Sequence, residues 1–488
     1  MTNEIIGVYF HKRWRVSALQ RFAERGIQLW DAIARRDFSP LLIIGVWLLV
    51  SVPPALCHGY HYVEGLTVTI AQSALDDGNW LTPHLYNLRW IERPTLLSWI
   101  IAAMSMPFGH VSPFVARLPI ILSLLAGAFL IRNALRRVAS AGAAMFGALA
   151  FLSSPVVIRY YVTAVADLPL AVILFATFLT WWNSYTTGRI SVGRWFGIGC
   201  LLAIAALLKG PQPVAYFALG IVAFAALTST WWQLPGLFLA SLLAAVPIGL
   251  WYANVFVPGD QGEWLRYTRL SPNGFTEPHP FANAIDFFFE SIPATLLVVP
   301  LLLTGAKSIG KRVPRHFIMA LGCYALTCTF VILFWPAEIN PRYILPMVLP
   351  LCVLAGIAYD ALLERWPTLV AGAISITLGL LGYAAIHSAS DGLLTPAYNH
   401  SKVDGAQISE LVARAQAPVY RIGWDTALNE LAYFAHRTTT IDQNAIPTIA
   451  KPAWIVVPAD AVSAIVARGN GHIKSRLVMD RAVLLRLE

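Results

Sequence analysis

Charged residues are scarce in this chain. Only 12% of its 488 residues are Asp, Glu, Lys or Arg, whereas soluble domains carry about 25%. This scarcity excludes a cytosolic globular enzyme, and the 57% of hydrophobic residues excludes a disordered protein. Long apolar runs and 17 Trp take the place of the missing charge, which is typical of a polytopic membrane protein. The composition leaves room for one soluble domain at most.

Cysteine is also scarce. Four of the five cysteines lie inside apolar runs: Cys200, Cys323, Cys328 and Cys352. The fifth, Cys57, lies near a predicted loop. The cysteines therefore form neither a disulfide framework nor a zinc-binding spacing.

The first 38 residues lack the apolar core of a cleavable signal. They carry seven Lys/Arg, and apolar residues recur among the arginines at helical spacing: Leu19, Phe22, Ala23, Trp30 and Ile33. This pattern predicts a basic amphipathic helix on the cytoplasmic leaflet. The alternative is a solvated cytoplasmic tail.

The apolar runs predict eleven membrane spans. They are 40–57, 115–132, 141–158, 167–185, 194–208, 212–230, 233–255, 286–305, 316–335, 343–361 and 367–387. Several are near the short end of the roughly 20 residues that a span needs. The stretch 95–108 is shorter still and is bounded by Pro94 and Pro107. We therefore expect an interfacial or re-entrant helix there.

Lys and Arg are divided unevenly between the two sides of this topology. With the N-terminus in the cytoplasm, 17 Lys/Arg face the cytoplasm and eight face the other side before residue 388. A full span at 95–108 would turn the cluster at 307–315 outward, against the positive-inside rule. Eleven spans are therefore favoured, and an odd number places the C-terminal segment outside the cytoplasm. This charge distribution, rather than nucleic-acid binding, explains the isoelectric point near 9.4.

The segment from residue 388 is different in character, since it holds 19 of the 61 charged residues. Short strands are predicted at 419–424, 438–442, 454–458 and 482–487, and helices at 409–415, 426–436 and 459–467. We therefore predict three parts. They are a cytoplasmic basic segment at 1–38, a transmembrane domain at 39–387 whose first outer loop is 58–114, and a small outer α/β domain at 388–488.

Charged and polar side chains gather in five outer loops. In chain order these hold Glu64, Asp76, Asp77, Glu92 and Arg93; Arg159, Tyr160, Tyr161 and Asp167; Lys209; the stretch 266–279; and Glu338, Arg342 and Tyr343. Charges near the hydrocarbon are costly and usually functional. Loops with aromatic, acidic and basic residues suit an amphipathic anionic substrate. A lipid phosphate fits, because Arg, Lys and Tyr bind phosphate oxygens.

Short motifs follow one another through these loops. They are Val63-Glu64-Gly65, then GNWLTPHL at 78–85, WIERP at 90–94, ARLP at 116–119, AVAD at 164–167, LKGP at 208–211 and PRYILP at 341–346. In this order, over 40–387, the chain resembles the GT-C glycosyltransferase superfamily. The lipid A aminoarabinose transferases and the protein O-mannosyltransferase-like proteins are the most similar in motif. The resemblance implies an inverting transfer of a sugar from a polyprenyl-phosphate donor, on the periplasmic side of an inner membrane.

The first loop departs from the family pattern. Val63 stands where an acidic residue often precedes the glutamate, Leu66-Thr67 replaces an Arg/Tyr region, and Arg93 replaces the lysine of E-K-P. The paired-acid form of the site is therefore absent from this loop. This leaves the acceptor and the aminoarabinose chemistry open.

Site roles follow from the loops and the resemblance together. Glu64 and Asp167 are the catalytic candidates, Glu64 as a base or a group that orients the acceptor. The candidates for binding the donor phosphate are Arg93, Lys209, Arg269 (or Arg266 beside it), Arg342 and Tyr343. Glu92 and Tyr161 are expected to support them. The alternatives are that Asp167 only favours the start of its helix and that Lys209 only snorkels at a helix end.

Metal binding stays open at this stage. His58, His61 and His279 could ligate a divalent metal, but no spacing demands it. If the acceptor were a phosphate oxygen, no strong base would be needed, and Glu64 would hold a metal or position the acceptor. Asp76 and Asp77 are expected to cap or solvate the loop.

The favoured function is sugar transfer from a polyprenyl phosphate to a lipid of the lipid A/lipopolysaccharide type or to a glycan. The alternatives are a protein O-glycosyltransferase of the same fold, a flippase for lipid-linked sugars, and a non-catalytic assembly protein. A flippase would place polar residues through the spans, and no internal repeat is visible. The expected partners are the sugar donor, its acceptor and membrane lipids, without nucleic acid, in a bacterial inner membrane.

Overall fold

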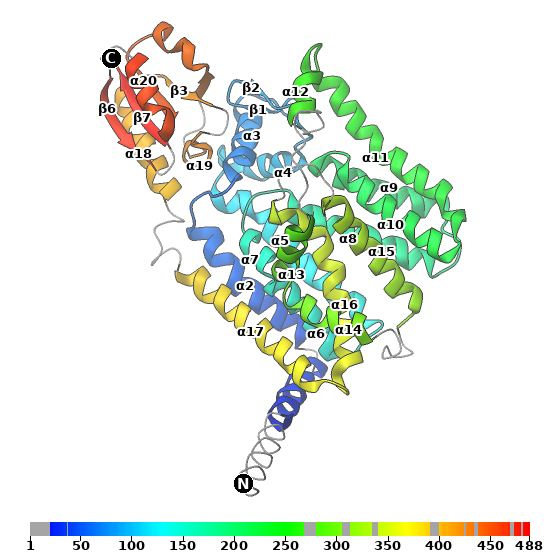
Figure 1. The fold of residues 1–488 in the computed structure, drawn as a ribbon. Helices are drawn as coiled ribbons and strands as arrows, with labels where there is room; N and C mark the ends of the chain where they lie inside the picture. Colours follow the sequence, from blue (N-terminus) through cyan, green and yellow to red (C-terminus); the bar gives the residue numbers. More distant parts are fainter. Residues whose placement is uncertain are drawn as a thin grey trace, which may run out of the picture.

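The chain folds into a helical membrane domain and a smaller α/β domain at one of its ends (Figure 1). The computed structural model describes residues 20–36, 38–267, 280–304, 313–333, 340–390, 400–423, 426–433, 438–468, 473–479 and 482–488. The expected fold class, a polytopic α-helical membrane protein with a C-terminal α/β domain, is confirmed.

The helices of the membrane domain follow the predicted apolar runs. They are α2 (Ser39–Cys57), α5 (Pro113–Arg136), α6 (Ala141–Ser153), α8 (Asp167–Tyr185), α9 (Val192–Lys209), α10 (Gln212–Thr228), α11 (Leu234–Val255), α13 (Pro280–Glu290), α14 (Ala294–Thr304), α15 (Arg315–Leu333), α16 (Leu345–Leu363) and α17 (Pro367–Ser390). The first outer loop adds α3 (Glu64–Asp76), the hairpin β1 (His84–Leu85) and β2 (Leu88–Arg89), and α4 (Leu96–Ser105). Shorter helices α7 (Pro155–Tyr160) and α12 (Asp260–Tyr267) precede α8 and follow α11.

Each of the eleven predicted spans falls on helical structure, but not every one of these helices is long enough by itself to cross a bilayer. Within the described residues, eight helices are long and apolar enough to cross a bilayer, or nine if α13 and α14 form one broken span. The predicted continuous span at 286–305 is wrong, because α13 and α14 meet at 113°. Two other expected spans are helical but short: α6 has 13 residues and α10 has 17. The stretch 96–108 is a short apolar helix, as predicted.

Small residues let the central helices approach closely. Helix α16 is apolar on all sides, and most of its residues are buried in the protein, as expected of a core helix. A side chain added at Gly147 of α6 or at Gly356 of α16 would lie 2.4 Å from a methyl carbon of Leu135 in α5. Glycine at these two positions therefore allows α5, α6 and α16 to pack together.

The N-terminal helix, 20–35, projects from the end of the bundle that lies away from the C-terminal domain (Figure 1). Trp30 Nε1 donates to Gly142 O (3.0 Å) at the start of α6, and Tyr359 Oη donates to Asp31 (3.2 Å). These contacts fix the helix to α6 and α16.

The C-terminal domain has a five-stranded sheet in the order β4-β3-β5-β7-β6. Strands β3 (Val419–Ile422), β4 (Thr438–Ile441) and β5 (Ala453–Pro458) are parallel, and β7 (Ala482–Leu487) pairs antiparallel with β5 and with β6 (Ile473–Val478). Helices α18 (His400–Ala415), α19 (Leu428–Leu431) and α20 (Val462–Arg468) accompany it. Four strands are confirmed. Strand β6 was not predicted, and the helix expected at 426–436 is only one turn within its described residues.

The C-terminal domain contacts the first outer loop through α19. Gly65 N–H in α3 donates to Asn429 Oδ1 (3.0 Å), and Asn429 Nδ2 donates to Tyr62 O (3.0 Å). A side chain at Gly65 would lie 2.1 Å from Leu428 O. Two backbones therefore meet here, and only glycine fits. Ser401 Oγ also donates to Tyr60 O (2.5 Å).

Candidate functional site

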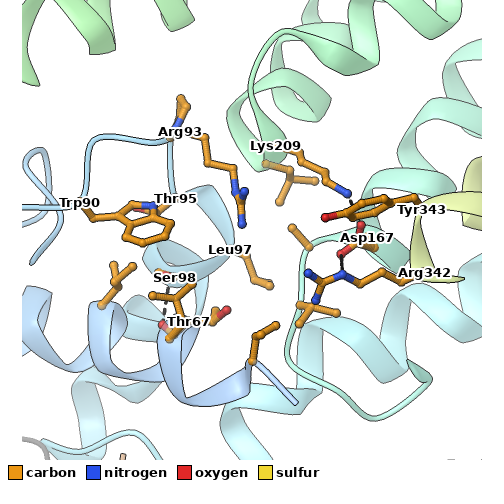
Figure 2. Close-up of a pocket in the computed structure, with 17 residues that line it drawn as sticks. Thr67, Trp90, Arg93, Thr95, Leu97, Ser98, Asp167, Lys209, Arg342 and Tyr343 are labelled. Atoms are coloured by element: carbon orange, nitrogen blue, oxygen red, sulfur yellow. Dashed lines mark hydrogen bonds and ion pairs between the residues drawn. The ribbon is translucent and has the colours of Figure 1, made fainter. Parts of the chain in front are cut away.

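A pocket opens between the first outer loop and the ends of three spans (Figure 2). Its polar lining comes from the loop before α4, the start of α8, the end of α9 and the turn at Pro341–Ile344. The charged and aromatic lining residues are Trp90, Arg93, Asp167, Lys209, Arg342 and Tyr343. Five predicted site residues that lie far apart in sequence thus line one pocket.

Asp167 is the centre of the charged wall. Its carboxylate forms an ion pair with Lys209 and lies 3.5 Å from Arg342 Nε (Figure 2). Within the described chain, that Nε–H is buried without a hydrogen-bond acceptor. The contact between Arg342 and Asp167 is therefore a loose ion pair, and the guanidinium lines the pocket.

Tyr343 packs against both cations. Lys209 Nζ lies 4.1 Å from the centre of the Tyr343 ring, and the Arg342 guanidinium carbon lies 5.5 Å from it. Cations over an aromatic face are stabilised by the ring quadrupole. Tyr343 thus keeps Lys209 and Arg342 at one end of the pocket.

Arg93 approaches from the opposite wall and points into the same space (Figure 2). Its guanidinium forms an ion pair with Glu92. The Glu92 carbonyl accepts hydrogen bonds from Tyr252 Oη (2.9 Å) and Trp264 Nε1 (3.2 Å). The backbone beside Arg93 is therefore fixed by α11 and α12.

Local sequence explains why these side chains reach the pocket. Helix α9 ends at Lys209 because Gly210 follows with φ +85°, a conformation that glycine adopts without strain. Asn340 caps the turn at Pro341–Ile344, since its side chain accepts from Arg342 N–H (3.3 Å). Asp167 is the first residue of α8, where an acidic residue is favoured.

Glu64 lies outside this lining and is fully buried. Arg117 donates to both of its carboxylate oxygens (3.0 and 2.7 Å), while the backbone N–H groups of His61 (3.0 Å) and Ala164 (2.8 Å) also donate. Burial alone would raise the pKa of Glu64, but the Arg117 charge and His61 hold that pKa far below its usual value. Glu64 is thus a saturated anion that joins the first loop to the segment before α8.

Other predicted residues lie elsewhere. The Tyr161 hydroxyl lies 2.6 Å from Ser388 Oγ, away from the pocket. Its neighbour Tyr160 donates to Asn340 Oδ1 (2.9 Å), and Asn340 caps the turn that carries Arg342. Arg269 and His279 lie outside the described residues.

Across the described ranges, no three side chains of His, Cys, Asp or Glu come together as metal ligands would. His61 instead contacts Glu64 and Thr163.

Sequence reasoning missed the role of Arg117. It lies within an apolar run and is fully buried. A charge in such a run is costly unless it is paired, and this was the available signal. Asn429, which fixes the first loop from the C-terminal domain, carried no comparable signal.

The lining suits an amphipathic anion. Three cations and one carboxylate surround a space that also has apolar walls, formed by Leu66, Ile70, Leu97 and Leu208. Arg and Lys can bind phosphate oxygens, and the apolar walls can hold a hydrocarbon chain. The pocket therefore fits a lipid phosphate.

Comparisons with known proteins point in the same direction. The family described as dolichyl-phosphate-mannose-protein mannosyltransferase matches residues 92–252. The undecaprenyl phosphate-alpha-4-amino-4-deoxy-L-arabinose arabinosyl transferase 2 of Proteus mirabilis (strain HI4320) is 25% identical over 340 residues, which are 65% of this chain. The matched part is 59% of the length of that relative.

Two solved structures share the fold. ArnT from Cupriavidus metallidurans, bound to undecaprenyl phosphate, superposes with a TM-score of 0.72 at 18% identity, over 93% of this chain and 98% of that chain. The archaeal oligosaccharyltransferase AglB from Archaeoglobus fulgidus, in complex with an inhibitory peptide and a dolichol-phosphate, has a TM-score of 0.55 at 11% identity, over 87% and 69%. The likeness extends through both the helical and the C-terminal parts of the first structure.

Proposed function

We propose that this chain transfers a sugar from a polyprenyl-phosphate donor to a lipid or glycan acceptor. It has the GT-C membrane glycosyltransferase fold and is related to the aminoarabinose transferases. The observation that carries the proposal is the convergence of Arg93, Lys209 and Arg342 around one pocket. One similar protein is named as an undecaprenyl phosphate-alpha-4-amino-4-deoxy-L-arabinose arabinosyl transferase, and the similar structure of ArnT is bound to undecaprenyl phosphate. Both support the donor class.

The pocket supplies what an inverting transfer needs. An acceptor oxygen attacks the anomeric carbon on the face opposite the phosphate, the carbon–oxygen bond to phosphate breaks, and the lipid phosphate leaves with the bonding electrons. Negative charge grows on the phosphate, where cations stabilise the transition state. Lys209 and Arg342 at one end and Arg93 at the other are placed for this, with Tyr343 as a further phosphate ligand.

Asp167 is the proposed base for an acceptor hydroxyl. It is the one carboxylate among the described lining residues, and a base must lie within reach of the proton that it accepts. A hydroxyl proton would pass to Asp167 as the new glycosidic bond forms. Glu64, with four donors on its two oxygens, is proposed as an anchor of the loop rather than as the base.

We place the pocket on the periplasmic side. The first outer loop and the C-terminal domain lie at one end of the bundle, and the N-terminal helix at the other (Figure 1). Together with the uneven distribution of Lys and Arg, this favours a cytoplasmic N-terminus in an inner membrane. A phosphatase fused at Glu488 should be active and a cytoplasm-dependent fluorescent protein dark. The reverse pattern would contradict the orientation.

A protein acceptor is the second candidate. The matching family is described by its transfer of mannose to protein. We favour a lipid or glycan acceptor because five similar proteins are undecaprenyl phosphate-alpha-4-amino-4-deoxy-L-arabinose arabinosyl transferases, whose names mention no protein acceptor. A flippase is less favoured, since the charged pairs of the pocket gather at one end of the spans.

Transfer can be tested directly. Purified protein, a radiolabelled undecaprenyl-phosphate sugar and a membrane extract should yield a labelled lipid or glycan. Lys209→Ala should abolish most of the label, whereas Lys402→Ala, an exposed lysine on α18, should not. Absence of labelled product from the wild-type protein, or label in protein alone, would contradict the favoured proposal. Mass spectrometry of lipid A and glycans from a deletion strain would then identify the acceptor.

A further inference from the structure

Tyr62 has an unusual backbone beside the pocket. Its φ is +51°, in a region that bulky residues rarely adopt, and its side chain is 49% exposed. The next residue, Val63, lines the pocket. Such strain persists only where the surroundings enforce it, and it clusters at functional sites.

The surroundings of Tyr62 do enforce it. Asn429 Nδ2 of the C-terminal domain donates to Tyr62 O (3.0 Å). The Tyr62 ring lies 5.3 Å from the ring of Tyr160 and 5.1 Å from that of His61, centre to centre. Two aromatic neighbours thus contact the Tyr62 ring, while about half of the residue stays accessible.

A charged pair lies beside this aromatic cluster. Arg159 forms an ion pair with Glu290 of α13 (2.7 Å), and its side chain is 41% exposed. Arg159 immediately precedes Tyr160 in α7. The Glu290 Oε2 atom is buried without a hydrogen-bond partner in the described part of the chain, so the carboxylate can accept a further hydrogen bond.

The cluster is continuous with the donor pocket. Tyr160 Oη donates to Asn340 Oδ1 (2.9 Å), and the same oxygen accepts from Arg342 N–H (3.3 Å). Arg342 in turn faces Asp167, the proposed base. A ligand on Tyr62 would therefore lie next to the reacting end of the donor.

We propose that Tyr62, supported by Tyr160 and flanked by Arg159 and Glu290, is the acceptor subsite and takes a sugar ring that bears an anionic group. This inference rests on the proposed function and names its acceptor class. An aromatic face is electronegative and attracts the C–H groups of a sugar ring. Arg159 binds the anionic group, and Glu290 accepts a hydrogen bond from a sugar hydroxyl.

An anchoring role at the membrane interface is the competing explanation for an exposed tyrosine. The two explanations differ in what they require of the ligand. An anchor responds to any lipid, whereas the subsite distinguishes a glycolipid from a phospholipid that has acyl chains and phosphate but no sugar ring.

Binding is measured with the full-length protein in detergent. Lipid A and phosphatidylglycerol are titrated separately against the wild type, Tyr62→Ala, Tyr62→Phe and Arg159→Ala. The control is Tyr383→Ala, an exposed tyrosine on α17. We expect Tyr62→Ala to weaken lipid A binding about tenfold, the effect of about one aromatic contact. Tyr62→Phe and Tyr383→Ala should match the wild type, and undecaprenyl phosphate binding should be unchanged in all of them. Arg159→Ala should weaken lipid A binding but not that of its dephosphorylated form.

The outcomes separate this inference from the proposed function. Transfer with a wild-type acceptor KM in Tyr62→Ala would overturn the subsite and leave the transferase standing. Lipid A binding that depends on Tyr62, without any transfer, would support the subsite and contradict the transferase. Equal responses to lipid A and phosphatidylglycerol, or no binding of lipid A by the wild type, would overturn the subsite.

Discussion

Two carboxylates of the outer end, Glu64 and Asp167, are both buried and both paired with cations, yet their surroundings differ. Each Glu64 oxygen accepts hydrogen bonds, and Arg117 also donates to the carbonyls of His58 (2.9 Å) and Gly59 (2.7 Å). That network is closed. The Asp167 carboxylate and its two cations instead line a pocket, where Arg342 Nε lies 3.5 Å from the carboxylate and forms only a loose ion pair with it.

This difference in hydrogen bonding determines which charged pair can bind a ligand. A saturated pair has no hydrogen-bonding capacity left, so its charges can only hold the chain together. A cluster of cations that is only partly paired contributes less to stability, but its cations can still bind an anion. We therefore expect changes at Glu64 and Arg117 to affect folding first, and changes around Asp167 to affect catalysis first.

Arg117→Ala should have the largest effect. It leaves the Glu64 carboxylate buried without its main partner, which costs about 3–5 kcal/mol of unfolding free energy. Unfolding in detergent, followed by tryptophan fluorescence, measures this. The double variant Glu64→Gln/Arg117→Met removes both charges and should be more stable than Arg117→Ala alone. Equal stability of Arg117→Ala and wild type would show that the pair is not an anchor.

Asp167→Asn should have the second largest effect. It should reduce turnover, whereas Glu64→Gln should reduce stability. Loss of a general base reduces turnover about 10²–10⁴-fold. Asparagine has nearly the size and shape of aspartate and fits the first turn of α8, so the unfolding midpoint should change little. Glu64→Gln should instead lower stability by about 1–3 kcal/mol, because donors around it lose their acceptor. Parallel turnover and unfolding assays decide. A stable but inactive Glu64→Gln would restore Glu64 as the catalytic residue.

Lys209→Ala and Arg342→Ala should each reduce kcat/KM on the order of a hundredfold. Each removes a cation from the leaving phosphate, an effect of about 3 kcal/mol. Arg414→Ala, which removes a 75% exposed arginine of α18, serves as the control. Wild-type turnover by both pocket variants, at normal expression, would remove them from the site.

Arg93→Lys should have the smallest effect. Lysine keeps the charge but loses the planar fork of guanidinium donors, so a loss of about 1 kcal/mol in transition-state stabilisation is expected. Arg93→Ala should be worse, at about 2–4 kcal/mol. Initial rates at saturating acceptor measure both. An Arg93→Lys rate below that of Arg93→Ala would contradict a phosphate-binding role.

The sequence predicted the location of a site residue correctly where that residue lies at the end of a span. Asp167 and Lys209 lie at the ends of α8 and α9, so counting spans brought them to one face. The partner of Glu64 could not be predicted in this way, because Arg117 lies inside α5 and its direction depends on how that helix is rotated. The spacing of motifs also gave no measure of depth. Glu64 and Arg93 belong to one loop, but α3 buries the first while the loop before α4 exposes the second to the pocket.

Strand β6 and the bend between α13 and α14 also escaped prediction. The sequence of β6, IKSRLV, lacks a regular alternation of apolar residues. The segment is a strand because it pairs with β7. The bend falls in an apolar run that hydropathy reads as continuous. Hydropathy reports composition along the chain, whereas the 113° angle is set by packing.

The close contact between Gly65 and α19 has a consequence for biosynthesis. The Gly65–Asn429 hydrogen bond joins residues that are 364 positions apart. At ribosomal rates of about 5–20 residues per second, α3 leaves the ribosome roughly 20–70 s before its partner is made. During that interval Tyr62 has no Asn429 to hold its backbone. A chain that stops before the last domain would insert its helices yet leave Tyr62 without this hydrogen bond, so the proposed acceptor subsite can form only after Asn429 has been made.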